Sequence, residues 1–289
     1  MYTIKNDKLK ITISDKGAEL KSILHLAHSL EYMWSGDPAY WAKTSPVLFP
    51  IVGTLKENTY VYKDRAYTLS RHGFARDKTF TVTSQQDHSI TFSLASDSTT
   101  LEAYPFAFVF YLVYTLKEDT LSVSYQVENT GNSEMFFSVG GHPAFKVPLV
   151  DGTSYTDYKV TFEKEETINR WPISKDGLIE LNPIPFMHQS NELLLTKDLF
   201  QKDAIVLKSL HSKSVQLSSN KTPHGLRFSF SDFPYLGLWA APRADFLCIE
   251  PWCGIADSVN SDQRLENKEG IIALPPSETF KAQWMAAFF

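Results

Sequence analysis

Cysteine is scarce in this sequence, with only Cys248 and Cys253 among 289 residues. Two thiols do not make a disulfide framework. Neither has a CxxC or HxxxH partner nearby, so we expect no zinc site. We expect both cysteines to be small, buried and reduced, and we expect the protein to need no metal or organic cofactor.

A long hydrophobic run is also missing. The longest apolar stretch, 106–114, is far too short to span a bilayer, and the first residues, MYTIKNDKLK, lack the apolar core of a signal peptide. Positive charge is not in excess, because 28 Lys and Arg stand against 33 Asp and Glu, a net charge of -5. These absences predict a soluble, cytoplasmic protein that binds neither nucleic acid nor membrane.

The common nucleotide-binding and hydrolase motifs are absent as well. The sequence contains no GxGxxG, P-loop, GxSxG or HExxH pattern. Dinucleotide, nucleotide, serine-hydrolase and zinc-protease activities therefore have no support. No segment keeps a helical period over three turns, which argues against a helical fold.

Strand patterns, in contrast, run from one end of the chain to the other. Residues 8–13 alternate strictly between polar and apolar side chains, and hairpins are predicted within 60–69, 79–95 and 106–128. No change of composition and no Gly/Ser linker marks a domain boundary. Residues 1–289 are therefore predicted to form a single all-β domain, a large antiparallel sandwich or barrel.

Two segments interrupt this pattern. The apolar segment 46–52 holds two prolines, which favours either an edge strand or an irregular buried segment. The polar segment 168–201 holds three prolines and is predicted to be mostly loop.

The first candidate site is 247–258, LCIEPWCGIADS. Three apolar residues lead into Glu250, and Pro251 should end the strand there because it cannot donate to a sheet ladder. A carboxylate at the end of a buried strand is costly unless it is paired or used. An arbitrary Glu at a strand end is more often a rim residue, but the apolar approach, the proline and Trp252 favour a functional base.

The second candidate is VGGHPAF at 139–145, where Pro143 should stop a strand just after His142. A lone His is more often a satisfied core residue. Here it shares its placement with Glu250, next to a proline at a strand end. A base needs an acid, so the pair favours acid–base catalysis.

The third candidate is RHGFARD at 71–77, which places His72 and Phe74 between two arginines. It reads either as a solvated polar loop or as a corner that binds hydroxyls or anions, since Arg and His supply fixed hydrogen-bond donors.

Together these motifs resemble the aldose 1-epimerase (mutarotase) superfamily, and its LacX-like branch in particular. HGFARD at 72–77, GGHPAF at 140–145 and IEPWCGIADS at 249–258 look like that group's signatures, in the same order. PVLFPIVG at 46–53 and LGLWAAP at 236–242 match as well. The resemblance implies a β-sandwich of the galactose-mutarotase type, a supersandwich, and the cofactor-free interconversion of the α and β anomers of an aldose.

The resemblance also implies roles for individual residues. The general base would be Glu250, the general acid His142, and a second sugar-contacting histidine His72. An acidic residue that holds sugar hydroxyls would fall on Asp203, with Asp232 as a competitor.

Three further residues are expected around the sugar. Trp239 or Phe74 would pack on its apolar face, and Arg71 would join the groups that bind hydroxyls. Members of the family commonly carry an Arg soon after the FPxxG segment, but here Gly53 is followed by Thr54-Leu55-Lys56. Any cationic role there would pass to Lys56 or to Arg71.

The expected substrate is a free aldose such as galactose or glucose. A hexose 6-phosphate would need an Arg fork. If the segment around His72 is extended, Arg71 and Arg76 point to opposite faces, so at most one would reach the sugar. The alternatives are a hexose-6-phosphate 1-epimerase, a non-catalytic carbohydrate-binding domain, or a domain of the same fold with an interaction role. The sequence leaves a homodimer open.

Overall fold

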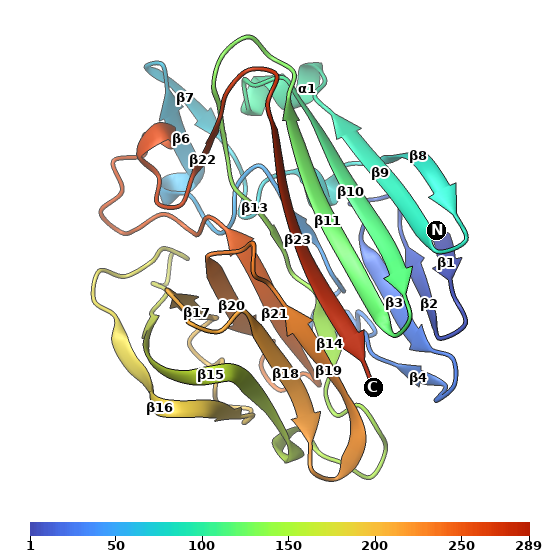
Figure 1. Ribbon diagram of the computed structural model, residues 1–289. Coiled ribbons are helices and arrows are strands. Elements are labelled where there is room, and N and C mark those ends of the chain that lie inside the picture. Colours follow the sequence, from blue (N-terminus) through green and yellow to red (C-terminus); the bar gives the residue numbers. More distant parts are fainter.

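The computed structural model describes residues 1–289 and consists mainly of antiparallel strands in four sheets (Figure 1). The N-terminal sheet has the order β1-β2-β3-β4. Its strands are β1 (Tyr2–Lys5), β2 (Leu9–Ile13), β3 (Leu20–His25) and β4 (Leu30–Glu31). Alternate residues of β2 are buried, as the strict period-2 pattern predicts.

The largest sheet has 15 strands. It contains the hairpins predicted within 79–95 and 106–128, whereas the hairpin within 60–69 forms a small sheet of its own. Its main path runs in the order β5-β13-β21-β20-β17-β15-β18-β19-β23-β11-β10-β9-β8, while β14 pairs with β21 and β16 with β15. The bounds along the main path are β5 (Val47–Leu48), β13 (Val139–Gly141), β21 (Phe246–Cys253), β20 (Tyr235–Trp239), β17 (Ile205–Lys208), β15 (Tyr158–Trp171), β18 (Ser214–Ser219), β19 (Thr222–Ser229), β23 (Thr279–Phe288), β11 (Thr120–Asn129), β10 (Phe108–Lys117), β9 (Ser89–Ala95) and β8 (Thr81–Gln86). The two side strands are β14 (Ala144–Lys146) and β16 (Ile184–Leu194).

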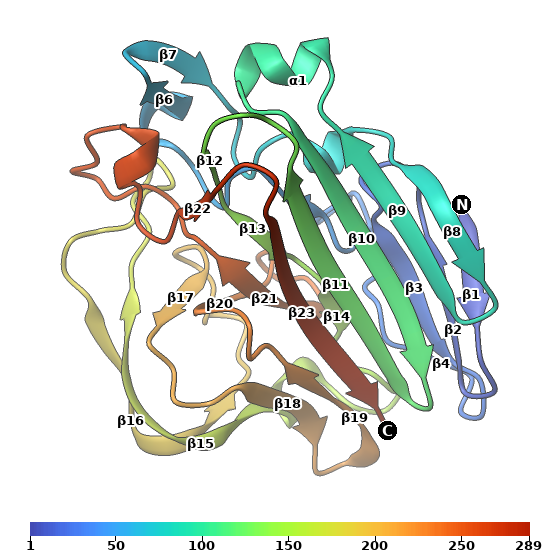
Figure 2. The same cartoon turned by 45° about the horizontal axis from the view of Figure 1, so that its top comes forward.

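This long sheet curls so that its β13–β21 end lies behind β11 and β23 (Figures 1 and 2). The approach is close: a Cβ on Gly141 of β13 would stand 2.7 Å from Tyr125 Oη on β11. Between the layers lies one core of 72 buried apolar residues. Strands β10 and β11 bury every second side chain in it, which is why their sequences alternate. The predicted all-β sandwich is confirmed.

Short elements close the ends of the sandwich (Figure 2). They are the hairpin β6 (Thr59–Tyr62) and β7 (Arg65–Thr68), the pair β12 (Met135–Phe137) and β22 (Ile272–Leu274), the helix α1 (Ser98–Ala103), and the 3-10 turns η1 (Lys56–Asn58), η2 (Ala75–Asp77), η3 (Tyr155–Asp157) and η4 (Leu265–Asn267). The hairpins predicted within 60–69, 79–95 and 106–128 are all present.

The helix α1 follows from a capping box. Asp97 accepts the Thr100 N–H at 2.7 Å, and the Thr100 hydroxyl accepts the Asp97 N–H at 2.8 Å. Six residues are too few to produce a helical period in the sequence. No helix of the structure combines the length and the apolar character that crossing a bilayer requires.

The prediction of mostly loop for 168–201 is wrong for much of its length. Strand β15 continues to Trp171, and β16 runs for 11 residues along it. Because β16 is an edge strand with most side chains in solvent and several register shifts, its sequence shows no clean alternation. Segment 46–52 combines both predicted forms: β5 is a two-residue strand at the edge of the sheet, and the rest is irregular and buried.

Candidate active site

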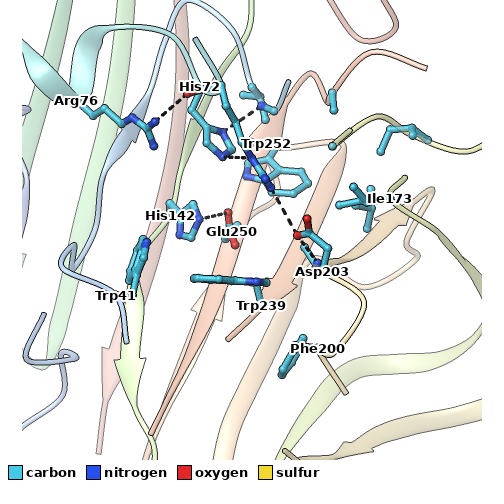
Figure 3. Close-up of a pocket in the computed structure, with 18 of the residues that line it drawn as sticks. Trp41, His72, Arg76, His142, Ile173, Phe200, Asp203, Trp239, Glu250 and Trp252 are labelled. Atoms are coloured by element: carbon cyan, nitrogen blue, oxygen red, sulfur yellow. Dashed lines mark hydrogen bonds and ion pairs between the residues drawn. The ribbon is translucent and has the colours of Figure 1, made fainter. Parts of the chain in front are cut away.

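The three candidate motifs meet around one cavity of about 450 Å³ (Figure 3). One side is formed by the 52–53 and 71–76 segments and by strands β20 and β21. The other side is formed by the loops before and after β16. The lining residues are Trp41, Val52, Gly53, Arg71, His72, Arg76, His142, Ile173, Gly177, Ile179, Phe200, Gln201, Asp203, Ala204, Val206, Trp239, Pro242, Glu250, Trp252 and Ala256.

Glu250 lies in the middle of β21, which continues through Pro251 to Cys253. The prediction that Pro251 ends the strand is therefore wrong. The Ile249 N–H donates to Pro143 O, and hydrogen-bonding direction alternates along a strand, so the Pro251 nitrogen faces the same side. On that side the sheet has a gap, because β13 ends at Gly141 and β14 begins at Ala144. The missing N–H of the proline thus leaves no ladder bond unmade.

His142 occupies this gap and reaches Glu250 directly, as Figure 3 shows: the distance from His142 Nε2 to Glu250 Oε2 is 3.2 Å. Trp41 stacks on the imidazole at a centroid distance of 4.9 Å, and Trp239 meets it edge-on at 5.7 Å. His72 stands edge-on from another side at 5.8 Å. Aromatic rings therefore fix the orientation of the imidazole and remove it from water.

Burial decides the protonation of this pair. The pKa of Glu250 is raised well above its ordinary value, mainly by burial and against the favourable charge of Arg71. The pKa of His142 is lowered to about 3, again mainly by burial. Because burial disfavours a net charge on the pair, the two groups share one proton over a wide pH range.

His72 is held by the backbone of the facing segment. Its Nδ1 accepts the Gly53 N–H at 3.1 Å, and Arg71 Nε lies 3.3 Å from its Nε2. Burial above all, and then the neighbouring His142 and Arg71, lower the pKa of His72 well below its ordinary value. The backbone at His72 is left-handed, with a φ of 69°, a strained conformation of the kind that concentrates at functional sites.

Arg71 and Arg76 both line the cavity, which corrects the expectation that at most one could. The segment is not extended: positive φ at His72 and Gly73 and the following turn η2 reverse the chain. Arg76 Nη2 donates to Arg71 O at 2.9 Å. Arg71 Nη2 lies 3.5 Å from Asp203 Oδ1 across the cavity.

Asp203 rather than Asp232 is the acidic residue at the cavity. Asp203 follows β16 in a loop, and Asp232 instead accepts the Gln283 N–H on the exposed side of β23. Two other sequence candidates do not reach the cavity. Lys56 directs its Nζ to Ser261 O at 3.4 Å, and Phe74 packs into the core against Phe49 and other aromatic rings.

Sequence reasoning missed part of the aromatic and apolar lining. Trp41 ends a short turn that follows Asp37, and its N–H donates to Asp37 O at 2.9 Å. Ile173, Ile179 and Phe200 come from the segment predicted to be loop. Nothing in their own sequence marks these residues, because the packing of distant segments brings them to the cavity.

The loop after β21 is anchored by a buried ion pair. Lys268 Nζ lies 2.8 Å from Asp257 Oδ1 and donates to Ile255 O at 2.6 Å. The other carboxylate oxygen of Asp257 accepts the Lys56 N–H at 2.9 Å. A Cβ on Gly53 would stand 2.5 Å from the Cβ of Ala256 in this loop. The 52–53 segment and the loop after β21 therefore pack against each other with no room for a side chain at position 53.

Taken together, an antiparallel β-sandwich, a buried carboxylate–imidazole pair, indole walls and a few charged side chains define a pocket that can bind a small polar molecule and exchange protons with it. The chain belongs to the aldose 1-epimerase family, whose model matches residues 1–282. This membership supports a carbohydrate epimerase type of function.

Similar proteins agree in length and fold. The chain is 36% identical over 290 residues to the chromosomal protein LacX of Lactococcus lactis subsp. lactis, covering 97% of each chain. Among solved structures it is similar to a galactose mutarotase related enzyme from Lactobacillus acidophilus, with 36% identity, a TM-score of 0.94, and 100% and 97% coverage of the two chains. A galactose mutarotase-like protein from Lactobacillus casei has 31% identity, a TM-score of 0.94 and full coverage of both chains.

Proposed function

We propose that this protein is an aldose 1-epimerase that interconverts the α and β anomers of a free aldohexose such as galactose or glucose. The observation that carries the proposal is the 3.2 Å contact between His142 and Glu250 in the cavity. Anomer exchange needs a base for the C1 hydroxyl proton and an acid for the ring oxygen. A carbohydrate-binding module would need neither.

The two groups act in opposite directions in the two halves of the reaction. In ring opening, Glu250 takes the proton of the C1 hydroxyl while His142 gives a proton to the ring oxygen. The C1–C2 bond then rotates. In ring closure, His142 takes the proton back and Glu250 returns its own to the C1 oxygen, now on the other face of the ring.

The shared proton of the pair fits this cycle. Opening starts from a carboxylate and an imidazolium and ends with a neutral carboxylic acid and a neutral imidazole. The second state has no separated charge, and it is the one that burial of Glu250 and His142 favours. A bound sugar, which contributes hydroxyl dipoles to the cavity, would bring the first state closer in energy. The two states would then interconvert at neutral pH.

The remaining lining groups would hold the sugar. Trp239 offers an apolar face, while His72, Arg71 and Asp203 offer donors and acceptors for hydroxyls. Arg71 and Asp203 lie 3.5 Å apart, so their charges compensate each other in the cavity.

Saturation-transfer NMR across a panel of aldoses tests the proposal directly. The protein should accelerate exchange between the anomeric signals of at least one free aldohexose above the spontaneous rate. Binding of a sugar without acceleration of exchange would instead identify a binding domain.

The pH dependence of exchange is expected to be flat where an ordinary histidine would titrate. Because burial lowers the pKa of His142 to about 3, the pair gains a second proton only at much lower pH. Because burial raises the pKa of Glu250, the pair also keeps its first proton at higher pH than an ordinary Glu would. Between about pH 5.5 and about pH 7.5, kcat/KM should change less than about twofold. A roughly tenfold fall centred near the ordinary imidazole pKa would contradict this protonation scheme.

A second candidate substrate is a hexose 6-phosphate, which the presence of both Arg71 and Arg76 at the cavity favours. Against it, Arg71 is paired with Asp203, and Arg76 already donates to Arg71 O. Neither guanidinium is free to form a full fork with a phosphate.

We therefore expect kcat/KM for glucose or galactose to exceed that for glucose 6-phosphate by at least about tenfold at equal ionic strength. The comparison includes Arg71→Ala and Arg76→Ala, with Lys56→Ala as the control because Lys56 points away from the cavity. A preference for the phosphorylated sugar that either arginine variant abolishes, and the lysine variant keeps, would establish the second candidate instead.

A further inference from the structure

Strand pairing assembles a third potential ligand beside the reacting pair. Cys248 and Glu250 are two residues apart on β21, so their side chains share one face of the sheet. The ligand atoms of His142, Cys248 and Glu250 all lie within 4.8 Å of one another, and all three residues are buried. Spacing along the chain did not predict this cluster, because His142 lies between β13 and β14, far from β21 in the sequence.

The distance between His142 and Glu250 fits two ligands of a tetrahedral metal ion. Two ligands at about 2.0–2.1 Å from a tetrahedral Zn²⁺ stand about 3.3 Å apart. His142 Nε2 and Glu250 Oε2 already stand 3.2 Å apart. Cys248 is fully buried behind the cavity lining, whereas the other two residues line the cavity. An ion between the three would have its fourth position open to the cavity.

The ligand types select among metal ions. One thiolate, one imidazole and one carboxylate suit Zn²⁺, while Mg²⁺ and Ca²⁺ require oxygen ligands. The charges also balance, since a thiolate and a carboxylate together carry the two negative charges that a buried divalent ion needs. Binding would exchange the shared proton of the pair and the thiol proton of Cys248 for one Zn²⁺, leaving the net charge of the site unchanged.

We infer that His142, Cys248 and Glu250 form a binding site for one thiophilic divalent cation, with Zn²⁺ as the probe ion. The bound ion takes the lone pairs of both reacting groups, so neither can accept or give a proton. Zinc is therefore a reversible inhibitor here, and removal of metal by a chelator leaves the activity intact. The inhibition rests on the proposed epimerase function, whereas the binding does not.

A second histidine cluster on the surface needs its own control. His28 stacks on His25 at a centroid distance of 4.3 Å and packs at a tilt against His224 at 4.6 Å, and His25 Nε2 lies 3.3 Å from Asp119 Oδ1. This cluster contains no thiol. Its contribution to metal binding can therefore be separated from that of Cys248 by spectroscopy and by variants.

The test titrates the metal-free, full-length protein with Co²⁺ and Zn²⁺. Thiolate–Co²⁺ charge-transfer absorption reports coordination by sulfur, and calorimetry in buffers of different ionisation enthalpy reports proton release. The variants are Cys248→Ser and Cys248→Ala, so that one of them folds if the other does not. Cys253→Ser is the matched control, because Cys253 lies five residues further along β21 and faces the opposite side. His28→Ala controls for the surface cluster.

We expect one Zn²⁺ per chain, the charge-transfer band, and release of about two protons per ion. Loss of an outer-shell partner weakens metal binding by 10–100-fold, so loss of the direct ligand Cys248 should weaken it by at least about 100-fold. Cys253→Ser and His28→Ala should bind as the unaltered protein does. No charge-transfer band, or equal zinc affinity in a folded Cys248 variant, would overturn the inference.

The inhibition is measured separately, by anomer exchange with and without Zn²⁺. If no aldose is turned over, the proposed function fails while the metal titration still decides the binding site. If exchange is observed, zinc should suppress it in the unaltered protein and in Cys253→Ser. Suppression should be lost in the Cys248 variants, each judged against its own zinc-free rate.

Discussion

Replacing Glu250 by Gln is expected to lower kcat for anomer exchange by roughly 10²–10⁴-fold, and replacing His142 by Asn should have an effect of similar size. Gln keeps the shape of the carboxyl group but cannot take the proton of the C1 hydroxyl. Asn keeps a polar group in the gap between β13 and β14 but cannot protonate the ring oxygen. Both residues are almost completely buried. Because each substitution removes a proton transfer, we expect the loss in kcat.

Line-shape or saturation-transfer NMR on purified, folded variants measures this effect. Glu166→Gln is a matched control, because Glu166 is also 1% exposed but binds the backbone and hydroxyl of Ser212, away from the cavity. That substitution should cost stability and leave kcat per folded molecule unchanged. Near-normal turnover in a folded Glu250→Gln or His142→Asn protein would remove the assignment of the reacting pair.

Replacing Lys268 by Met is expected to reduce the free energy of unfolding by roughly 3–5 kcal/mol. The ammonium group is the partner of the buried Asp257 carboxylate, and its own side chain is 2% exposed. Without it, a buried negative charge keeps only the Lys56 N–H as a donor, and Ile255 O loses its partner as well. Since domains are commonly stable by about 5–15 kcal/mol, one substitution would remove a large fraction of the total.

Urea unfolding followed by tryptophan fluorescence measures the loss. The control is Lys8→Met, which breaks a contact of the same 2.8 Å length to Asp119, but at the surface, where solvent screens the charges. Its unfolding midpoint should stay close to that of the unaltered protein. An equal shift for both variants would mean that burial of the Lys268–Asp257 pair has no special weight.

The sandwich could be predicted from the sequence because the patterns that indicate strands and hairpins lie within short segments of the chain. Half-buried strands such as β10 and β11 alternate residue by residue, and short turns join them into hairpins. The pairing of Glu250 with His142 was predicted from two similar local patterns, each a polar residue next to a proline. The structure brings the two side chains into contact, while their catalytic roles stay a prediction.

Other features depended on contacts between distant segments and could not be predicted. Pro251 was expected to end β21, but the gap beside it accommodates a residue without an N–H. Arg76 was expected to point away from Arg71 because an extended backbone was assumed, and the two left-handed residues between them reverse the chain. Trp41 carried no local signal at all, since its role comes from stacking on His142.

The interlocked wall around Gly53 also has a consequence for motion. Gly53 meets Ala256 with no room for a side chain, its N–H and carbonyl are both bonded to His72, and the ion pair of Lys268 holds the loop behind. These contacts hold the segments together as one wall. The segment before β16 belongs to the same wall, because Ile179 exchanges backbone hydrogen bonds with Asp257 and Val259. Any opening that admits or releases a sugar therefore falls to the loop around Asp203, whose contact with the wall is the 3.5 Å ion pair with Arg71. Substitutions in this loop would change the rates at which a sugar binds and dissociates without disturbing Glu250 and His142.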